Sequence, residues 1–173
     1  IVFDLDIRHS REQFRDQYPG EMQELVRMRE IDLKQAGYVS LEIEGMKLGD
    51  HYTFGPAPDY DSYASRLLRV YSYAESGVDV KDITYRCKVD QANGNKILVS
   101  INCNDKDMGR KACVMAAFTM FTPDVFSIHL PEYEKGLLKQ YADVTLAGAC
   151  KDEWGFPGRF DPQTFDLWYS ESM

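Results

Sequence analysis

Histidine and cysteine, the side chains that most often ligate zinc or act as nucleophiles, are few and scattered in this chain of 173 residues. They are His9, His51, His129, Cys87, Cys103, Cys113 and Cys150. No pair has the close spacing that is typical of a zinc site. We therefore expect no metal ligands and no cofactor. We also expect four free thiols, which favours a reducing, cytoplasmic compartment.

Two aspartates, Asp4 and Asp6, lie in the opening segment Ile-Val-Phe-Asp-Leu-Asp-Ile, where apolar and acidic residues alternate as in a β-strand. The segment resembles the first motif of the haloacid-dehalogenase-like phosphohydrolases. The resemblance implies that Asp4 is a nucleophile, that Asp6 is a general acid/base and that Mg²⁺ is bound nearby. A Mg²⁺-dependent phosphohydrolase is therefore an alternative hypothesis. The other interpretation is an amphipathic strand with one acidic face.

Three tyrosines, Tyr60, Tyr63 and Tyr71, recur at helical spacing in the segment 59–76. Asp59 is a good N-cap and Gly77 a natural stop, so we predict a helix there. A row of phenol rings offers apolar area and hydrogen-bonding tips, which suits a ligand pocket. A small-ligand carrier is thus a second alternative, while packing of this helix against a sheet is the other interpretation.

Aromatic residues are concentrated after residue 150, interleaved with Gly and Pro and without periodicity. They are Trp154, Phe156, Phe160, Phe165, Trp168 and Tyr169. We predict a C-terminal arm over residues 151–173. Because Trp and Tyr dominate interface energetics, these six side chains are the predicted partner-binding residues. The alternative is that the arm packs onto its own domain.

The composition is that of an ordinary soluble globular chain, with 44% hydrophobic and 28% charged residues. The 20 basic and 28 acidic residues give a net charge of −8, which argues against binding to duplex nucleic acid or to anionic lipid. No apolar stretch approaches the ~18–20 residues needed to span a bilayer. We expect a single domain over residues 1–173, with divisions near residues 37 and 150.

Further helices are predicted over residues 20–36 and 108–121, the latter apolar on nearly every side. Short helices should begin after the Ser10 cap, over 11–17, and at Pro131. Strands are predicted over 1–7, 39–43, 126–130 and 144–147.

A hairpin is predicted over residues 82–103, where two strands flank a turn. We expect a three-residue loop, Ala92-Asn93-Gly94, with Gly94 in the left-handed conformation. In that register Val89 lies opposite Ile97, and Cys87 lies opposite Val99. Cys87 and Cys103 are then too far apart for a disulfide.

The predicted order over residues 38–150 is strand, Tyr-bearing helix, strand pair, apolar helix, short helix and strand. The strand pair ends in Ile97-Leu-Val-Ser-Ile-Asn-Cys-Asn-Asp105. This order is similar to the core of rhabdovirus-type matrix proteins, which form a self-associating layer beneath a viral envelope. The resemblance implies a viral structural protein that binds other copies of itself.

The predicted fold class is therefore α+β: a mainly antiparallel sheet with about three packed helices and an aromatic C-terminal arm. We expect a non-enzymatic protein-binding or self-assembling domain. Its partner would be another protein or a second copy in a homo-oligomer, and not a nucleic acid.

Overall fold

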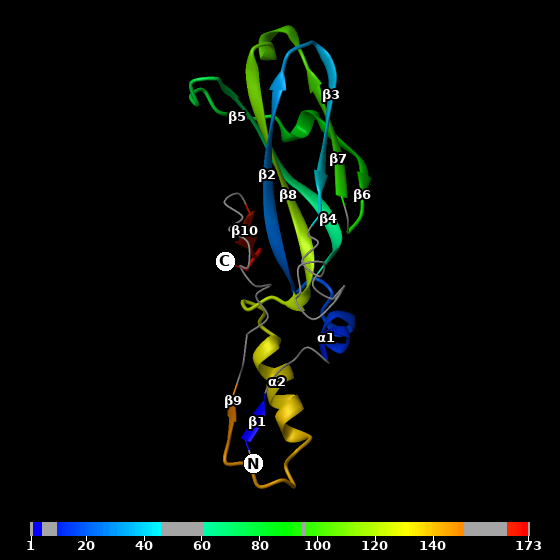
Figure 1. Cartoon of the computed structure of the whole chain (residues 1–173), viewed down its shortest axis with the longest axis vertical. Coiled ribbons are helices and arrows are strands. Elements are labelled where there is room, and N and C mark those ends of the chain that lie inside the picture. The colour runs from blue at the N-terminus through cyan, green and yellow to red at the C-terminus, as the bar shows by residue number, and fades with distance from the viewer. Residues whose placement is uncertain (1, 5–9, 46–60, 95, 151–165, 173) are drawn as a thin grey trace, which may run out of the picture. The chain divides into compact units, whose positions relative to one another are not determined.

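The chain is described by a computed structural model over residues 2–4, 10–45, 61–94, 96–150 and 166–172 (Figure 1). It divides into two compact units, which we call the helical unit and the sandwich unit. The described residues of the helical unit are 2–4, 10–23, 121–150 and 170–172. Those of the sandwich unit are 24–45, 61–94, 96–120 and 166–169. The prediction of a single domain with divisions near residues 37 and 150 stays a prediction.

Two sheets make up the sandwich unit (Figure 1). The five-stranded sheet has the order β10 (Asp166–Tyr169), β2 (Met22–Leu33), β8 (Arg110–Pro123), β4 (Ser62–Ala74) and β5 (Lys81–Asp82). The three-stranded sheet has the order β3 (Gly37–Glu44), β7 (Lys96–Cys103) and β6 (Cys87–Ala92). Both pairings in the smaller sheet are antiparallel, as are β10–β2, β8–β4 and β4–β5. Two short 3₁₀ helices, η4 (Thr84–Arg86) and η5 (Asp105–Asp107), connect strands.

The core of the sandwich unit lies between these sheets. Its fully buried members from β8 and β7 are Ala112, Val114, Ala116, Phe118, Met120, Ile97, Val99 and Ile101. Side chains from β2, β3 and β4 complete the same cluster. Burying each large aliphatic or aromatic side chain contributes about 1.5–3 kcal/mol, so this layer is the main source of stability for the unit.

The prediction of about three packed helices is wrong. The described residues contain only two α-helices, and the segments 20–36, 59–76 and 108–121 form β2, β4 and β8 instead. In β8 every second residue from Ala112 to Met120 is buried, which is the period of a strand. The Ala and Met content and the apolar character on both faces masked this alternation.

The helical spacing in β4 has a different explanation. Residues four apart share a face of a helix, but they also share a face of a strand. Tyr63, Leu67 and Tyr71 are spaced by four, so they fit both periods. Two register shifts, between Ser62 and Ala64 and between Leu67 and Arg69, then disturb the strict alternation that would have revealed a strand.

The hairpin prediction is confirmed in kind but not in register. β6 and β7 pair antiparallel, with Val89 opposite Val99 and Cys87 opposite Ile101, two residues beyond the expected partners. The shift of two preserves which side chains share a face. A bulge between Val89 and Gln91 absorbs an extra residue, and the Asn93 N–H donates to the Lys96 carbonyl at 3.0 Å. All four cysteines are free, as expected.

Gly94 is needed for a reason other than the predicted one. Its φ is not in the left-handed region, so conformational freedom is not what selects glycine here. A Cβ at this position would lie 2.5 Å from the Ser62 carbonyl oxygen and 2.6 Å from Tyr63 Cα. The turn therefore packs directly against the backbone of β4, where no other residue fits.

The helical unit contains α1 (Arg11–Gln17), α2 (Leu130–Lys139) and a parallel strand pair, β1 (Val2–Asp4) with β9 (Gly148–Cys150). Its core consists of Phe14, Met22 and Leu130, with Tyr18, Phe121, Tyr133 and Leu137 packed against them. The helix over 11–17 is confirmed, although the Ser10 side chain makes no capping hydrogen bond. The helix that starts near Pro131 is confirmed too.

The strands expected over 126–130 and 144–147 are wrong. Residues 124–129 form turns leading into α2, and β9 begins only at Gly148. Among the described residues, no helix has the length and apolar character needed to cross a membrane.

Candidate functional site

Three connections meet at one end of the sandwich unit (Figure 1). Gly37 of β3 pairs with Cys103 of β7, and Ala74 of β4 pairs with Arg110 of β8. The Gly109 N–H donates to the Leu33 carbonyl at 3.0 Å, which brings the end of β2 to the start of β8. The connections 34–36, 75–80 and 104–109 therefore lie together, and we call this region the loop end.

The backbone of the loop end is unusually constrained. Four described residues have a positive φ: Gly37, Gly77, Gly109 and Asp79. All four lie at the loop end. Asp79, at φ 55°, is the one that is not glycine, and aspartate tolerates this conformation better than most residues do. The three glycines adopt it without strain, whereas Asp79 persists in it because surrounding contacts hold it.

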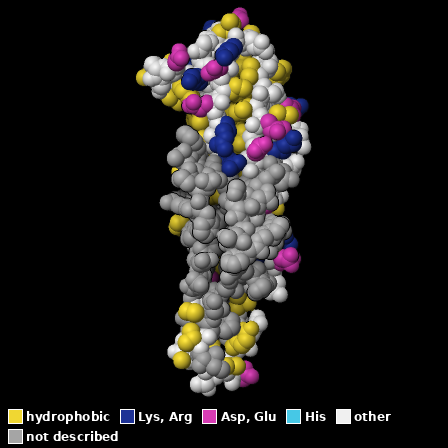
Figure 2. Space-filling model, in the orientation of Figure 1, with side chains coloured by type: hydrophobic (Ala, Val, Ile, Leu, Met, Phe, Trp, Pro, Cys, Tyr) yellow, Lys and Arg dark blue, Asp and Glu magenta, His cyan; other side chains and the backbone are white. Residues whose placement is uncertain are grey.

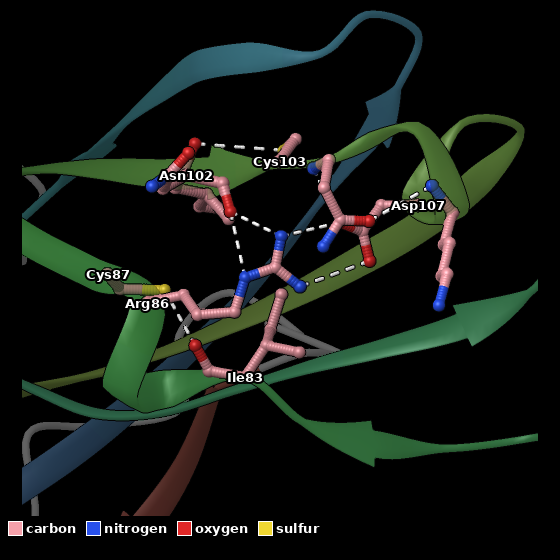
Figure 3. A network of polar contacts seen from close by, with 9 residues as sticks. Ile83, Arg86, Cys87, Asn102, Cys103 and Asp107 are labelled. Atoms are coloured by element: carbon pink, nitrogen blue, oxygen red, sulfur yellow. Dashed lines mark hydrogen bonds and ion pairs between the residues drawn. The ribbon is translucent and has the colours of Figure 1, made fainter.

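An arginine clamp joins η4 to η5 (Figure 3). The Arg86 guanidinium donates to both carboxylate oxygens of Asp107, at 3.2 and 2.5 Å, and its Nε donates to the Asn102 carbonyl at 2.9 Å. The two charged side chains are only 16% and 9% exposed. The hydrogen bonds from Arg86 hold the pKa of Asp107 below its ordinary range.

Asp107 also orders η5 itself. Its Oδ2 accepts the Asn104 N–H at 2.8 Å, while the Asn104 side chain accepts the Lys106 N–H at 3.0 Å. This reciprocal arrangement is a capping box. The same carboxylate thus fixes the shape of the β7–β8 connection and its attachment to η4.

A second arginine clamp holds the β4–β5 connection. Arg110 Nη1 donates to Asp79 Oδ2 at 2.7 Å, and Nη2 donates to the Asp79 carbonyl at 2.5 Å and to the Ser72 carbonyl at 3.2 Å. Lys81 Nζ lies 2.8 Å from the same Asp79 oxygen. Hydrogen bonds from Lys81 and then Arg110 lower the pKa of Asp79. The contacts with Arg110 and Lys81 hold the left-handed Asp79 in place.

Large apolar side chains flank both clamps and are exposed to solvent. Val78 and Val80 lie on either side of Asp79, Tyr85 precedes Arg86, and Met108 follows Asp107. Tyr85 is 84% exposed, the most of any large apolar side chain in the described residues. We call these four residues the loop-end surface. Hydrophobic side chains lie among charged ones at this end of the sandwich unit in Figure 2.

The loop end together with the strand and 3₁₀ residues that adjoin it carries no net charge. Residues 32–34, 75–86 and 104–111 contain six acidic and six basic side chains, whereas the whole chain has a net charge of −8. The acidic excess therefore lies elsewhere. A partner can approach this end without the like-charge repulsion that an acidic surface would impose.

A cavity of about 180 Å³ adjoins the second clamp. It is lined by Asp32, Leu33, Lys34, Glu75, Gly109, Arg110 and Lys111. Two acidic and three basic side chains are among them, so the lining favours neither anions nor cations strongly. Its size suits one side chain of a partner better than a whole ligand, since ligand pockets usually occupy ~300–1,000 Å³.

The helical unit holds a second polar cluster. Glu21 Oε1 lies 2.6 Å from His129 Nδ1, and the Tyr18 ring stacks on the imidazole with 4.3 Å between centroids. The Ser127 hydroxyl donates to the other Glu21 oxygen and accepts the Leu130 N–H at 3.1 Å. Because the hydroxyl bonds the carboxylate and not the imidazole, this cluster lacks the Ser–His contact of a hydrolytic triad. It anchors the start of α2.

No group of three potential metal ligands occurs among the described residues. Asp4 lies at the end of β1, where its backbone pairs with Cys150 of β9, and Asp6 falls outside the described residues. The phosphohydrolase therefore stays a prediction.

Of the predicted tyrosines, Tyr63 and Tyr71 lie eight residues apart on β4, about 26 Å at the usual rise of a strand. Tyr60 lies outside the described residues. Tyr63 and Tyr71 therefore belong to a strand and not to a helical face, and neither lines the cavity at the loop end.

Most of the predicted aromatic arm lies outside the described residues: Trp154, Phe156, Phe160 and Phe165. Trp168 and Tyr169 belong to β10, which pairs antiparallel with β2. The Arg66 guanidinium lies 5.8 Å from the centre of the Tyr169 ring. This last part of the arm is thus an edge strand of the sandwich unit, while partner binding by the arm stays a prediction.

The loop-end surface was missed in the sequence. Its signal was weak: isolated apolar residues within otherwise polar turns, as in Gly77-Val-Asp-Val-Lys81 and Asp105-Lys-Asp-Met-Gly109. An apolar side chain in a polar turn has no core to enter, so it is exposed unless it has a partner.

No protein-family model matches the sequence, and neither a curated protein nor a solved structure is significantly similar to it. The order of elements on which the similarity to rhabdovirus-type matrix proteins rested is not the order found, because two of its helices are strands. The evidence for a function therefore comes from the residues of the loop end themselves.

Proposed function

We propose that this protein is a protein-recognition domain whose loop-end surface binds a partner protein. The partner offers a weakly charged, apolar surface to Val78, Val80, Tyr85 and Met108. A small side chain of the partner enters the adjoining cavity beside Arg110. The observation that carries the proposal is the pairing of each arginine clamp with exposed apolar side chains.

The physical reason lies in the entropy of binding. Ordering a rotamer-rich side chain or a loop at an interface costs about 0.5–1.5 kcal/mol per immobilised side chain. Arg86 and Arg110 have already fixed the backbone on which the four apolar residues stand. Less ordering remains for the partner to impose, so more of the apolar burial contributes to affinity.

The test is site-specific photo-crosslinking. A benzoylphenylalanine side chain replaces Tyr85 in one variant and Met108 in another, and each is irradiated in an extract of the cells that make the protein. The matched control carries the same group at Ile128, which is 78% exposed in the helical unit. The adduct is identified, and its unmodified partner is then purified.

We expect one major adduct, shared by positions 85 and 108 and absent at 128. Equal yields at all three positions would mean that exposure alone governs capture, and the proposal would fail. An adduct with a second copy of this chain, or with lipid, would overturn the assignment of a different protein as the partner.

A further inference from the structure

The sheets of the sandwich unit end in four edge strands that differ in how well they are protected. β10 has four residues and β5 has two, so neither is itself a long edge, and each covers only part of its neighbour: Glu24–Arg27 of β2 and Tyr71–Ser72 of β4. The uncovered part of β4 carries two register shifts. β6 is interrupted by the bulge between Val89 and Gln91. β3 is the exception: all eight residues, Gly37–Glu44, pair with β7 without any register shift. Among the described residues no strand pairs with its other side.

A long, regular edge is a template for another strand, and proteins usually protect such edges with lysine, proline or a bulge. β3, with the sequence Gly-Tyr-Val-Ser-Leu-Glu-Ile-Glu, has none of these. Arg27 donates to the carbonyls of Glu44 and Gly45, at 2.7 and 3.0 Å, and so occupies only its last residues. Within the described part of the chain, the stretch from Gly37 to Ile43 has no strand paired to this side.

The sequence of β3 is compatible with pairing to itself. In an antiparallel pair centred on Leu41, Val39 lies opposite Ile43 of the second copy, and Leu41 lies opposite Leu41. These residues face the core side of the sheet, where Ile43 is buried and Val39 and Leu41 pack against the core cluster. On the outer face Tyr38 meets Glu44, and Ser40 meets Glu42.

Most other registers are worse. The nearest competitor is centred on Ser40: it opposes no like charges either, but it places Gly37 opposite Ile43 and so pairs fewer apolar side chains. A shift of one residue places apolar side chains opposite polar ones along the whole strand. Centring the pair on Ile43 places Glu42 opposite Glu44, and like charges directly opposite each other are destabilising. The register centred on Leu41 matches every pair in character and opposes no two charges of the same sign.

We propose that β3 pairs antiparallel with β3 of a second copy, with Leu41 on the two-fold axis. The two three-stranded sheets then form one continuous sheet of six strands. The contact is isologous, as in most soluble homodimers. It uses different residues from the loop-end surface and leaves that surface available, so it goes beyond the proposed function.

The first test is a disulfide scan under mild oxidation, in a Cys150→Ser background that removes the exposed native thiol. Leu41→Cys places two thiols directly opposite each other, at a separation that a disulfide can bridge. Val39→Cys is the matched control, on the same face of the same strand. In the proposed register its thiol lies about 13 Å from its copy, too far to bridge.

The second test uses two charge variants at one position, measured by analytical ultracentrifugation. Ser40→Glu places a carboxylate opposite Glu42 at two symmetric positions, whereas Ser40→Lys places an ammonium group there. Both variants lose the same 2.8 Å hydrogen bond to Ser100, so this loss is common to the two. The free energy of unfolding of each monomer is measured alongside, because Asp90 also bonds Ser100. We expect Ser40→Lys to dimerise on the order of tenfold more tightly than Ser40→Glu.

The proposal is supported if Leu41→Cys crosslinks, Val39→Cys does not, and the two Ser40 variants shift dimerisation in opposite directions. It is overturned if the unaltered chain is a monomer at millimolar concentration. Equal crosslinking at positions 39 and 41, or equal dimerisation of both Ser40 variants, would also overturn it. None of these outcomes bears on binding by Tyr85 and Met108.

Discussion

Replacing Asp107 by asparagine tests whether the Arg86 clamp fixes the loop end. The change keeps the size of the side chain and one carbonyl oxygen, which can still accept the Asn104 N–H. It removes the negative charge opposite Arg86. The guanidinium, 16% exposed, then lacks a counter-ion while its bonds to the Asn102 carbonyl persist.

The magnitude follows from that geometry. Breaking a buried ion pair by removing one partner costs about 3–5 kcal/mol. The lower end applies here, because Arg86 retains the Asn102 carbonyl and one amide oxygen as acceptors. We expect Asp107→Asn to lower the free energy of unfolding by about 3 kcal/mol. At a urea m-value of ~2 kcal/mol/M this shifts the unfolding midpoint by about 1.5 M.

Chemical unfolding followed by circular dichroism measures this loss. Asp90→Asn is the matched control, because the Asp90 carboxylate pairs with Lys88, whose side chain is largely exposed. Its effect should be much smaller than that of Asp107→Asn. If Asp107→Asn costs less than ~1 kcal/mol, or no more than Asp90→Asn, the clamp does not hold the loop end and the reasoning is refuted.

The pH dependence gives a second check on the same variant. Because Arg86 lowers the pKa of Asp107 below its ordinary value of 3.8, the clamp contributes fully above that pH. Its contribution is lost as the pH falls through the lowered value. The difference in stability between the unaltered chain and Asp107→Asn should therefore shrink in strong acid. A constant difference would contradict the assignment to the ionised pair.

Four further predictions concern single side chains. The Ser72 hydroxyl is buried without a hydrogen-bond partner among the described residues. Ser72→Ala should therefore leave the free energy of unfolding in urea unchanged or raise it by up to about 1 kcal/mol. A clear loss of stability would contradict this. Gly94→Ala should lower the free energy of unfolding by about 1–3 kcal/mol in the same assay, because the added Cβ meets the backbone of β4. An unchanged free energy of unfolding would show that the turn can move away. Burial opposes ionisation of Glu21, but hydrogen bonds from Ser127 and His129 outweigh it and lower its pKa below 4.5. The ionised form thus stabilises the helical unit above that pH and less as the pH falls, and Glu21→Gln should show a shallower loss of near-UV circular dichroism on acidification. Burial raises the pKa of Cys87 to about 11 and also raises those of Cys103 and Cys113. A thiol reagent at pH 8 should therefore react with one fast site, and Cys150→Ser should remove it. Two or more fast sites would contradict the burial of the other three thiols.

Sequence patterns predicted the parts of this fold whose signals are local. The strand containing Val39, Leu41 and Ile43 was predicted because its inward residues alternate strictly with polar ones. The hairpin was predicted because its turn and flanking patterns agree. The helix over residues 11–17 was predicted from its cap position, even though Ser10 does not form the bond.

The long strands were missed because their signals conflict. β8 is rich in Ala and Met, which favour helices in isolation, and tertiary contacts between two sheets override that preference. In β4, register shifts and spacing by four mimic a helix. The loop-end surface depends on ion pairs such as Arg86–Asp107, between residues 21 positions apart, which no local pattern reveals.

The most direct test of the recognition surface is a calorimetric titration of the purified partner, identified by crosslinking, against three forms of the full chain. These are the unaltered protein, Tyr85→Ala and the control Ile128→Ala. Truncating an interface hot spot costs about 2 kcal/mol or more, so Tyr85→Ala should raise Kd roughly 30-fold. Ile128→Ala should leave Kd unchanged. An equal Kd for Tyr85→Ala and the unaltered protein would contradict the account.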